Sequence, residues 1–264
     1  PVSVLQSLAR ADFYRVLSLA LDFPVSDNIS IIEEISEALV ESDMTDIRLK
    51  PLLDGLKNLS TPEIISGLES EYFRIFSSGL ECPESEGSYY PVDRGTVLGD
   101  VCAFYEAFGL QAQSKQGAPD SMKMELAFMS FLCLKEGFAV ENNDRENLEI
   151  VIDAEKKFLL DHLGRWGFIF AHRLLETSEN EFYKNISMIL QLFLELEIQK
   201  FGINPARVDN YLKPKNGESL ESQFECADGP SHRSPRDSGK SVIPFACGNE
   251  ALGDNQGVME NVSG

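Results

Sequence analysis

The sequence predicts an all-α protein, a single bundle of about nine to eleven helices with a flexible C-terminal tail. Apolar residues recur at three- and four-residue intervals in nearly every segment up to about residue 212, whereas strand-like alternation is hard to find. Beyond residue 213 this periodicity stops, and serine, glycine and proline dominate. We therefore assign residues 1–212 to one helical domain and residues 213–264 to a disordered tail.

The first two helices are defined by their start and stop signals. Apolar positions run at helical spacing from Val4 to Leu21, and the helix is expected to stop before Pro24, because proline disfavours helical geometry in the preceding residue. The second helix is expected to begin at Ser30, because Ser30 and Glu33 have the spacing of a capping box.

The next three helices enclose a long loop. A third helix is expected to start near Pro51, and a fourth to follow the N-cap Thr61, which precedes a proline and an acid. Residues 79–95 are too rich in proline, glycine and serine for regular structure, and an ordered loop of this kind often carries function. A fifth helix is expected to end at Gly109, a residue that adopts a left-handed cap easily.

The second half of the domain contains the most apolar helix. The segment from Asp120 to about Phe138 is apolar over most of its circumference, so this helix is expected to open at Asp120 and to lie centrally. Residues 144–163 predict an amphipathic helix, with a break or bend at Gly164. The last helix is expected to be capped by a box starting at Ser178 and to end at Gly202.

Charge and cysteine content exclude several classes of function. The formal net charge is -20, which repels nucleic acid and anionic lipid headgroups and favours a basic peptide as partner. The five cysteines are odd in number and never form a C-x-x-C pair, which argues against disulfides and zinc. No apolar run approaches the roughly 18 residues that span a bilayer, and no secretory signal is evident. We expect a cytoplasmic protein without stable membrane insertion.

The residue inventory also argues against catalysis, a cofactor or a metal. His162, His172 and His232 have no metal-binding spacing, and no phosphate loop, dinucleotide fingerprint or nucleophile elbow is present. His162 and His172 lie near acids and could shuttle protons. We favour a structural role for these imidazoles, next to Trp166.

Glu125 is an unusual residue, because its neighbours on the helix are nearly all apolar. A buried carboxylate must face a cavity, pair with a base such as Arg165 or Arg15, or accept backbone hydrogen bonds. Two interpretations stay open: a structural ion pair, and the wall of a groove that recognises a cationic ligand.

Five segments, in this order, resemble the TorD/DmsD/NarJ family of molybdoenzyme assembly chaperones. Glu71–Phe76 is similar to its E-Y-x-x-L-F helix end, and Cys82–Tyr89 to its proline-containing loop. Tyr105–Leu110 resembles the segment before the second loop, Asp120–Met129 the motif P-D-H-x-x-x-E-L-x-F-M, and Phe158–Trp166 the motif F-L-x-x-H-L-x-x-W. Ser121 stands where that motif has histidine.

The resemblance implies a TorD-like chaperone that catalyses nothing. Such a protein binds the twin-arginine leader, the immature catalytic subunit of a molybdopterin oxidoreductase, or both, and prevents export until the cofactor is inserted. It would be a monomer or a domain-swapped dimer. The alternatives are a NarJ-type assembly factor for a non-exported nitrate reductase-like subunit and a generic helical adaptor. A nucleotide-handling enzyme is disfavoured, because the chain has no phosphate loop.

We expect the partner site between the 79–95 loop and the start of the Asp120 helix, where two long loops meet one largely apolar helix. The residues predicted to bind the partner or its leader peptide are Asp120, Ser121, Glu125, Tyr72, Phe76, Glu86 and Tyr89. His162 and Trp166, both in the segment Phe158–Trp166, are predicted to have a structural role.

Overall fold

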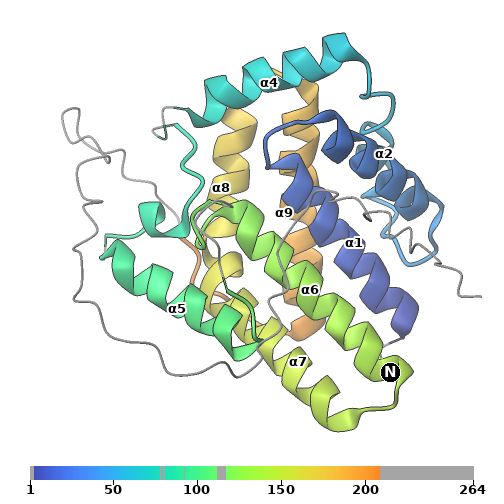
Figure 1. Cartoon of the computed structure of the whole chain (residues 1–264), viewed down its shortest axis with the longest axis vertical. Helices are drawn as coiled ribbons and strands as arrows, with labels where there is room; N and C mark the ends of the chain where they lie inside the picture. Colours follow the sequence, from blue (N-terminus) through green and yellow to red (C-terminus); the bar gives the residue numbers. More distant parts are fainter. Residues whose placement is uncertain (1–2, 78, 80, 92, 112–116, 209–264) are drawn as a thin grey trace, which may run out of the picture.

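The described part of the chain, residues 3–77, 79, 81–91, 93–111 and 117–208 of the computed structural model, consists of helices joined by loops (Figure 1). In chain order the elements are α1 (Val4–Ala20), α2 (Ser26–Glu41), α3 (Lys50–Asp54), α4 (Pro62–Phe76), η1 (Glu86–Tyr89), α5 (Arg94–Ala107), α6 (Met122–Glu141), α7 (Arg145–Phe158), η3 (Leu159–Leu163), α8 (Gly164–Thr177) and α9 (Glu181–Phe201). These ranges contain no β-strand, which confirms the all-α prediction. The expected tail at residues 213–264 lies outside them.

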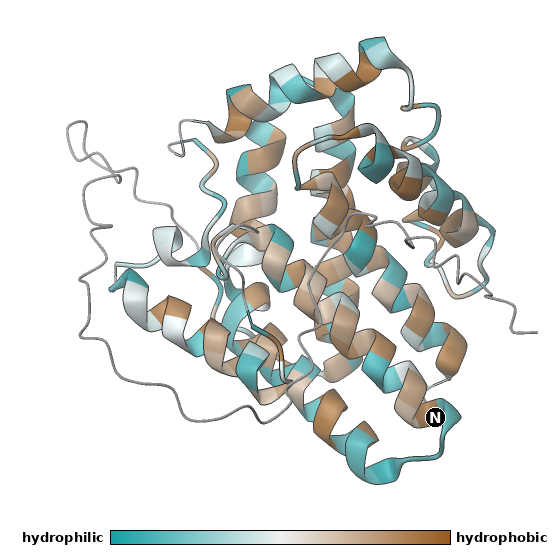
Figure 2. Cartoon of the chain, viewed as in Figure 1, coloured by the Kyte–Doolittle hydropathy of each residue, from teal (hydrophilic) through white to brown (hydrophobic). Residues whose placement is uncertain are grey.

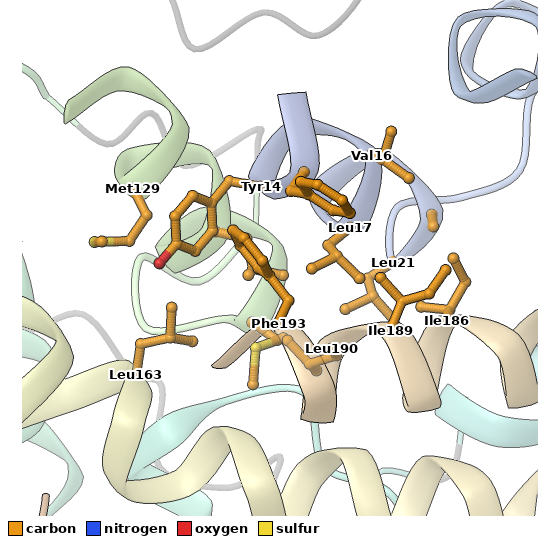
Figure 3. Close-up of a cluster of buried hydrophobic side chains, with 14 of the residues drawn as sticks. Tyr14, Val16, Leu17, Leu21, Met129, Leu163, Ile186, Ile189, Leu190 and Phe193 are labelled. Atoms are coloured by element: carbon orange, nitrogen blue, oxygen red, sulfur yellow. The ribbon is translucent and has the colours of Figure 1, made fainter. Parts of the chain in front are cut away.

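The core lies where α1, α6, α8 and α9 meet. Helix α1 packs along α6, α8 packs along α9, and α2 and α7 cover α1 and α6 respectively. Figure 1 shows α4 crossing one end of the bundle and α5 on the side opposite to α2. Figure 3 shows side chains from α1, α6, η3 and α9 converging in one apolar cluster. Its labelled members are Tyr14, Val16, Leu17, Leu21, Met129, Leu163, Ile186, Ile189, Leu190 and Phe193.

Helix α6 is central, as predicted. Leu126, Phe128, Met129 and Leu132 are completely buried, and α6 contacts α1, α7 and η3. The outer helix α4 differs, because hydrophilic and hydrophobic residues alternate along it (Figure 2). One face of α4 therefore packs on the bundle while the other meets solvent.

Several predicted helix ends are confirmed. The Thr61 hydroxyl accepts a hydrogen bond from the backbone N–H of Ile64 at 3.4 Å and so caps α4. Gly109 and Gly202 follow α5 and α9 with φ of 75° and 59°, in the left-handed region that favours glycine. Pro51 lies in the first turn of α3, as predicted, although α3 is only five residues long.

The predicted start of the second helix is wrong. Helix α2 begins at Ser26 with Val25 as its N-cap residue, so Ser30 lies inside the helix. Glu33 caps nothing in α2, because its carboxylate accepts hydrogen bonds from Leu59 N–H and the Ser60 hydroxyl. A tertiary contact therefore uses the side chain that the local spacing assigned to a capping box.

The predicted cap of the last helix is also wrong. Ser178 lies two residues before the N-cap of α9. Its hydroxyl donates a hydrogen bond to the carbonyl of Leu174, in the last turn of α8. Asn180 is that N-cap, and its side-chain oxygen accepts from Phe182 N–H at 2.8 Å. Asparagine serves this role as well as serine does.

Three boundaries near the expected site need correction. Helix α6 begins at Met122 with Ser121 as N-cap, so Asp120 precedes the helix. The 79–95 loop contains the 3-10 turn η1 and the first residues of α5. The expected break at Gly164 is a change of hydrogen-bond pattern: α7 continues through the π-helical turn η3 directly into α8.

Candidate functional site

The two loops that the sequence singled out meet in space. An isolated antiparallel bridge joins Ser85 and Ser121, with a hydrogen bond from Glu86 N–H to the Asp120 carbonyl at 2.8 Å. A second bond, also of 2.8 Å, runs from Met122 N–H to the carbonyl of Glu84. These contacts fix η1 against the N-terminal end of α6.

Asp120 holds the loop from inside the protein. Its side chain is only 1% exposed, and Oδ2 accepts a hydrogen bond from Gly87 N–H at 3.1 Å. The approach depends on glycine, because a Cβ atom at position 87 would lie 2.5 Å from Cγ of Arg94 and 3.2 Å from that carboxylate oxygen. The neighbouring Ser121 hydroxyl is buried and has no hydrogen-bond partner among the described residues.

Glu125 pairs with Trp166. The indole Nε1–H donates to Glu125 Oε2 at 3.1 Å, and both side chains are fully buried. The suggested pairing with Arg165 or Arg15 is not what the structure shows. Arg165 instead lies 4.8 Å from the ring centroid of Tyr90, a cation–π contact on the far side of the loop.

Glu125 is buried beside a second acid, Glu86. Burial, and then the negative charge of the neighbouring Glu86 carboxylate, raise the pKa of Glu125 well above its usual range. The Oε1 atom of Glu125 accepts no hydrogen bond from the described residues. When the carboxyl group is protonated, this oxygen can instead donate a hydrogen bond toward Glu86. The raised pKa favours the protonated form of Glu125 next to the Glu86 side chain.

Glu86 continues the network to His162. The distance between Glu86 Oε2 and His162 Nδ1 is 2.9 Å, and the two side chains are 1% and 7% exposed. Phe104 and Phe158 pack against the imidazole with ring centroids 5.4 Å and 5.1 Å away. The chain of contacts runs Trp166, Glu125, Glu86, His162. It joins the two predicted structural residues with two predicted partner-binding residues.

Tyr89 packs against this network. Its hydroxyl donates to the Pro83 carbonyl at 2.9 Å, and its ring lies 5.2 Å from that of Trp166. His162 and Trp166 are four residues apart across η3, which places both on one face of the helix. A π-helical turn is rare and is often found at functional sites.

A cavity of about 710 Å³ lies directly over the Glu86–His162 pair, between α5 and the junction of η3 with α8. We call it the α5 cavity. Glu86 and His162 form part of its wall, whereas Asp120, Ser121, Glu125 and Tyr89 are buried behind it. The lining residues are Glu86, Tyr90, Thr96, Val97, Asp100, Ala103, Phe104, Ala107, Asp161, His162 and Arg165.

Tyr72 and Phe76 lie elsewhere, on α4. Their rings are 4.9 Å apart, and Tyr72 also packs edge-on against Phe23 at 5.5 Å. The Tyr72 hydroxyl donates to Glu84 Oε1 at 3.3 Å, which links this aromatic group to the start of the loop. These two residues do not line the α5 cavity.

A second buried charge cluster was missed from the sequence. Arg10 on α1 donates to Glu136 at 2.6 Å, to Glu197 at 2.7 Å and to Glu155. Burial raises the pKa of Glu155 to about 7, although Arg10 acts in the opposite direction. Isolated charges within apolar helix faces are the sequence signal, but their spacing along the chain does not reveal that they meet.

The remaining ionisable residues do not form a metal site. No group of His, Cys, Asp and Glu in the described ranges could hold a metal ion. His172 is exposed and pairs with Glu176 at 3.3 Å. Cys82, Cys102 and Cys133 are free thiols, and Cys226 and Cys247 lie outside the described residues. None of the described helices has the length and hydropathy needed to span a bilayer.

Comparison with known proteins identifies the family. The model of the nitrate reductase delta subunit family matches residues 27–172, which include η1, α5, α6 and the Glu86–His162 pair. The chlorate reductase assembly chaperone protein of Ideonella dechloratans is 30% identical over 146 residues, 53% of this chain and 73% of the relative. The selenate reductase assembly chaperone protein of Thauera selenatis is 34% identical over 116 residues, 42% of this chain and 59% of the relative.

These names describe chaperones rather than catalysts, in agreement with the expectation from the residue inventory. The matched residues contain all five segments on which the resemblance to the TorD/DmsD/NarJ proteins rests, in the same order, from the end of α4 to the motif ending at Trp166. The chain therefore belongs to the nitrate reductase delta subunit family of assembly chaperones, and the predicted resemblance is confirmed.

Proposed function

We propose that this protein is a cytoplasmic chaperone for an immature molybdopterin oxidoreductase subunit and that the α5 cavity binds a basic, partly apolar segment of that client, such as a twin-arginine leader. The observation that carries the proposal is the composition of the cavity wall. Asp100, Asp161 and Glu86 supply acids, while Val97 and Phe104 supply apolar surface. Relatives named as assembly chaperones of chlorate and selenate reductases support the choice of client class.

The charges at the cavity favour a guanidinium ligand. Asp100 on α5 and Asp161 on η3 are exposed, so each can accept hydrogen bonds from a ligand. The single arginine in the wall, Arg165, is held over the Tyr90 ring. Carboxylates bind arginine through paired, charge-assisted hydrogen bonds, which lysine cannot reproduce.

The buried network behind the cavity gives it a fixed shape. Glu86 is held by His162, and its backbone is held by Asp120. A rigid wall lowers the entropy lost when a flexible leader binds. In this proposal Asp120, Glu125 and Trp166 position the loop, and the client contacts Glu86, Tyr90, Asp100 and Asp161.

Titration calorimetry with a synthetic leader tests the proposal. The peptide should contain two consecutive arginines followed by an apolar stretch, and a second peptide should carry lysines in their place. We expect the double variant D100N/D161N to bind the arginine peptide at least about tenfold more weakly than wild type, with a smaller difference for the lysine peptide.

The matched control removes the same charge at a distant place. Glu146 and Glu149 are exposed on α7 and do not line the cavity, so E146Q/E149Q should bind as wild type does. Equal affinity of wild type and D100N/D161N would remove the cavity as the binding site. Equal weakening by both double variants would show that only the overall charge matters.

A further inference from the structure

A second groove lies along α1, on the side of the bundle away from the α5 cavity. Two hollows of about 480 Å³ and 300 Å³ share the lining residues Ala9, Asp43 and Met44, so they are continuous. We call this feature the α1 groove. Its walls are α1, the C-terminal end of α2, the connection between α2 and α3, and α9. Figure 1 shows α2 and α5 on opposite sides of α1 and α6.

The α1 groove exposes apolar side chains. Leu5 is 66% exposed, Leu8 is 39% exposed and Met44 is 43% exposed, and all three line its smaller hollow. Single exposed leucines are common on protein surfaces, but several in one hollow indicate a binding surface. Methionine suits such a surface, because its flexible side chain adapts to different ligands.

The charged residues that line the smaller hollow are acidic. Asp12 and Asp43 lie beside the apolar residues. Helix α2 ends here at Glu41, Ser42 is its C-cap residue, and its last turn contains no basic residue to offset the negative end of the helix dipole. In the larger hollow, the cations Arg10 and Lys200 are already paired with buried carboxylates. A ligand therefore meets apolar surface next to Asp43 and the negative end of α2, whereas Asp12 also has Arg15 as a charged neighbour.

We propose that the α1 groove binds an amphipathic helix of the unfinished client that carries basic residues along one edge of its apolar face. Apolar residues of that helix would cover Leu5, Leu8 and Met44, and its basic residues would reach Asp12, Asp43 and the end of α2. The identity of the client rests on the function proposed above, whereas binding at the groove does not. The α1 groove and the α5 cavity share no lining residue, so a ligand in one leaves the lining of the other free.

Fluorescence anisotropy with a defined probe tests this inference. The probe is a labelled helical peptide of about 15 leucines and lysines, with leucine at helical spacing. Wild type should bind it, and the double variant L8E/M44E should weaken binding at least about tenfold. D12N/D43N should weaken it by a smaller factor and reduce its salt dependence. Substitution at these exposed positions leaves the core intact, which circular dichroism verifies.

The matched control introduces the same two charges outside the groove. Ile64 on α4 and Ile150 on α7 are 37% and 52% exposed, so I64E/I150E should bind the probe as wild type does. The inference is overturned if I64E/I150E loses as much affinity for the probe as L8E/M44E does. It is also overturned if wild type binds a leucine–glutamate peptide as tightly as the leucine–lysine probe. Sedimentation velocity provides a further test: a wild-type dimer that L8E/M44E converts to monomer would assign the groove to a second copy of this chain.

The two proposals fail separately. L8E/M44E should retain the arginine-peptide affinity that D100N/D161N loses, and D100N/D161N should retain binding of the leucine–lysine probe. If wild type does not bind the arginine peptide but binds the probe through Leu8 and Met44, the groove stands and the cavity assignment falls.

Discussion

Trp166 binds Glu125 across the centre of the bundle: the indole Nε1 lies 3.1 Å from Glu125 Oε2, and the two residues are 41 positions apart in sequence. The contact joins α6 to α8 behind the α5 cavity. Burial raises the pKa of Glu125 and so favours a neutral hydrogen bond inside the core. The carboxylic acid bridges Trp166 on one side and Glu86 on the other.

A neutral amide should replace this acid with little effect. Glutamine at position 125 keeps an acceptor for Trp166 and a donor toward Glu86, so E125Q should lower the free energy of unfolding by less than about 1 kcal/mol at pH 7. E125A leaves the indole N–H unpaired and opens a cavity, and should cost about 3 kcal/mol. Urea unfolding measures both. If E125Q by itself lowered the free energy of unfolding by much more than about 1 kcal/mol, Glu125 would be ionised in the folded protein.

The Arg10 cluster predicts a larger loss of stability. R10M leaves the buried carboxylates of Glu136, Glu155 and Glu197 without their guanidinium and should lower the free energy of unfolding by about 3–5 kcal/mol. Adding E155Q removes one of the unpaired charges, so R10M/E155Q should be more stable than R10M in denaturant titrations. If R10M/E155Q were less stable than R10M, unpaired negative charge on the buried carboxylates would not be the cause of the loss in R10M.

The sequence predicted local features well and distant pairings poorly. Thr61, Gly109 and Gly202 mark helix ends through their own backbone and side-chain preferences. These preferences involve only residues close by in the sequence. Ser30 and Ser178 have equally good local patterns but fail, because Glu33 and Ser178 bind other partners in the folded chain. Local spacing proposes a cap, and tertiary contacts decide whether it forms.

The candidate site shows the same limit. Sequence motifs identified Glu86, Glu125, His162 and Trp166, but their order of contact depends on pairings between residues 41 and 76 positions apart. Of the exposed acids that face the α5 cavity, Asp100 lies in no motif and Asp161 occupies a variable position of the F-L-x-x-H-L-x-x-W motif. Only the packing of α5 against η3 brings these acids together with Glu86.

Glu155 predicts a pH dependence of stability. Its pKa is about 7 in the folded protein, above the ordinary value of 4.5. Between these values the folded state holds a proton that the unfolded state has lost, so the stabilisation is fully present below pH 4.5 and disappears as pH rises toward 7. The shift corresponds to about 3 kcal/mol.

The comparison of wild type with E155Q isolates this effect from other acids. Glutamine does not titrate, so the free energy of unfolding of E155Q relative to wild type should increase between pH 5 and pH 8. Chemical unfolding at several pH values measures the difference. A constant difference over this range would mean that Glu155 titrates as an ordinary glutamate.

Gly164 should be indispensable to the π-helical turn that carries His162. A Cβ atom at this position would lie 2.3 Å from the Leu159 carbonyl oxygen and 2.8 Å from Cγ of Pro205, and neither atom belongs to a flexible side-chain end. G164A should therefore lower the free energy of unfolding by about 2 kcal/mol. The control is G67A in α4, where a Cβ meets no atom within 4 Å, and alanine should stabilise the helix by about 0.5–1 kcal/mol. Thermal unfolding of both variants should thus show shifts of opposite sign; a stabilised G164A would mean that the turn relaxes to a regular α-helix without loss.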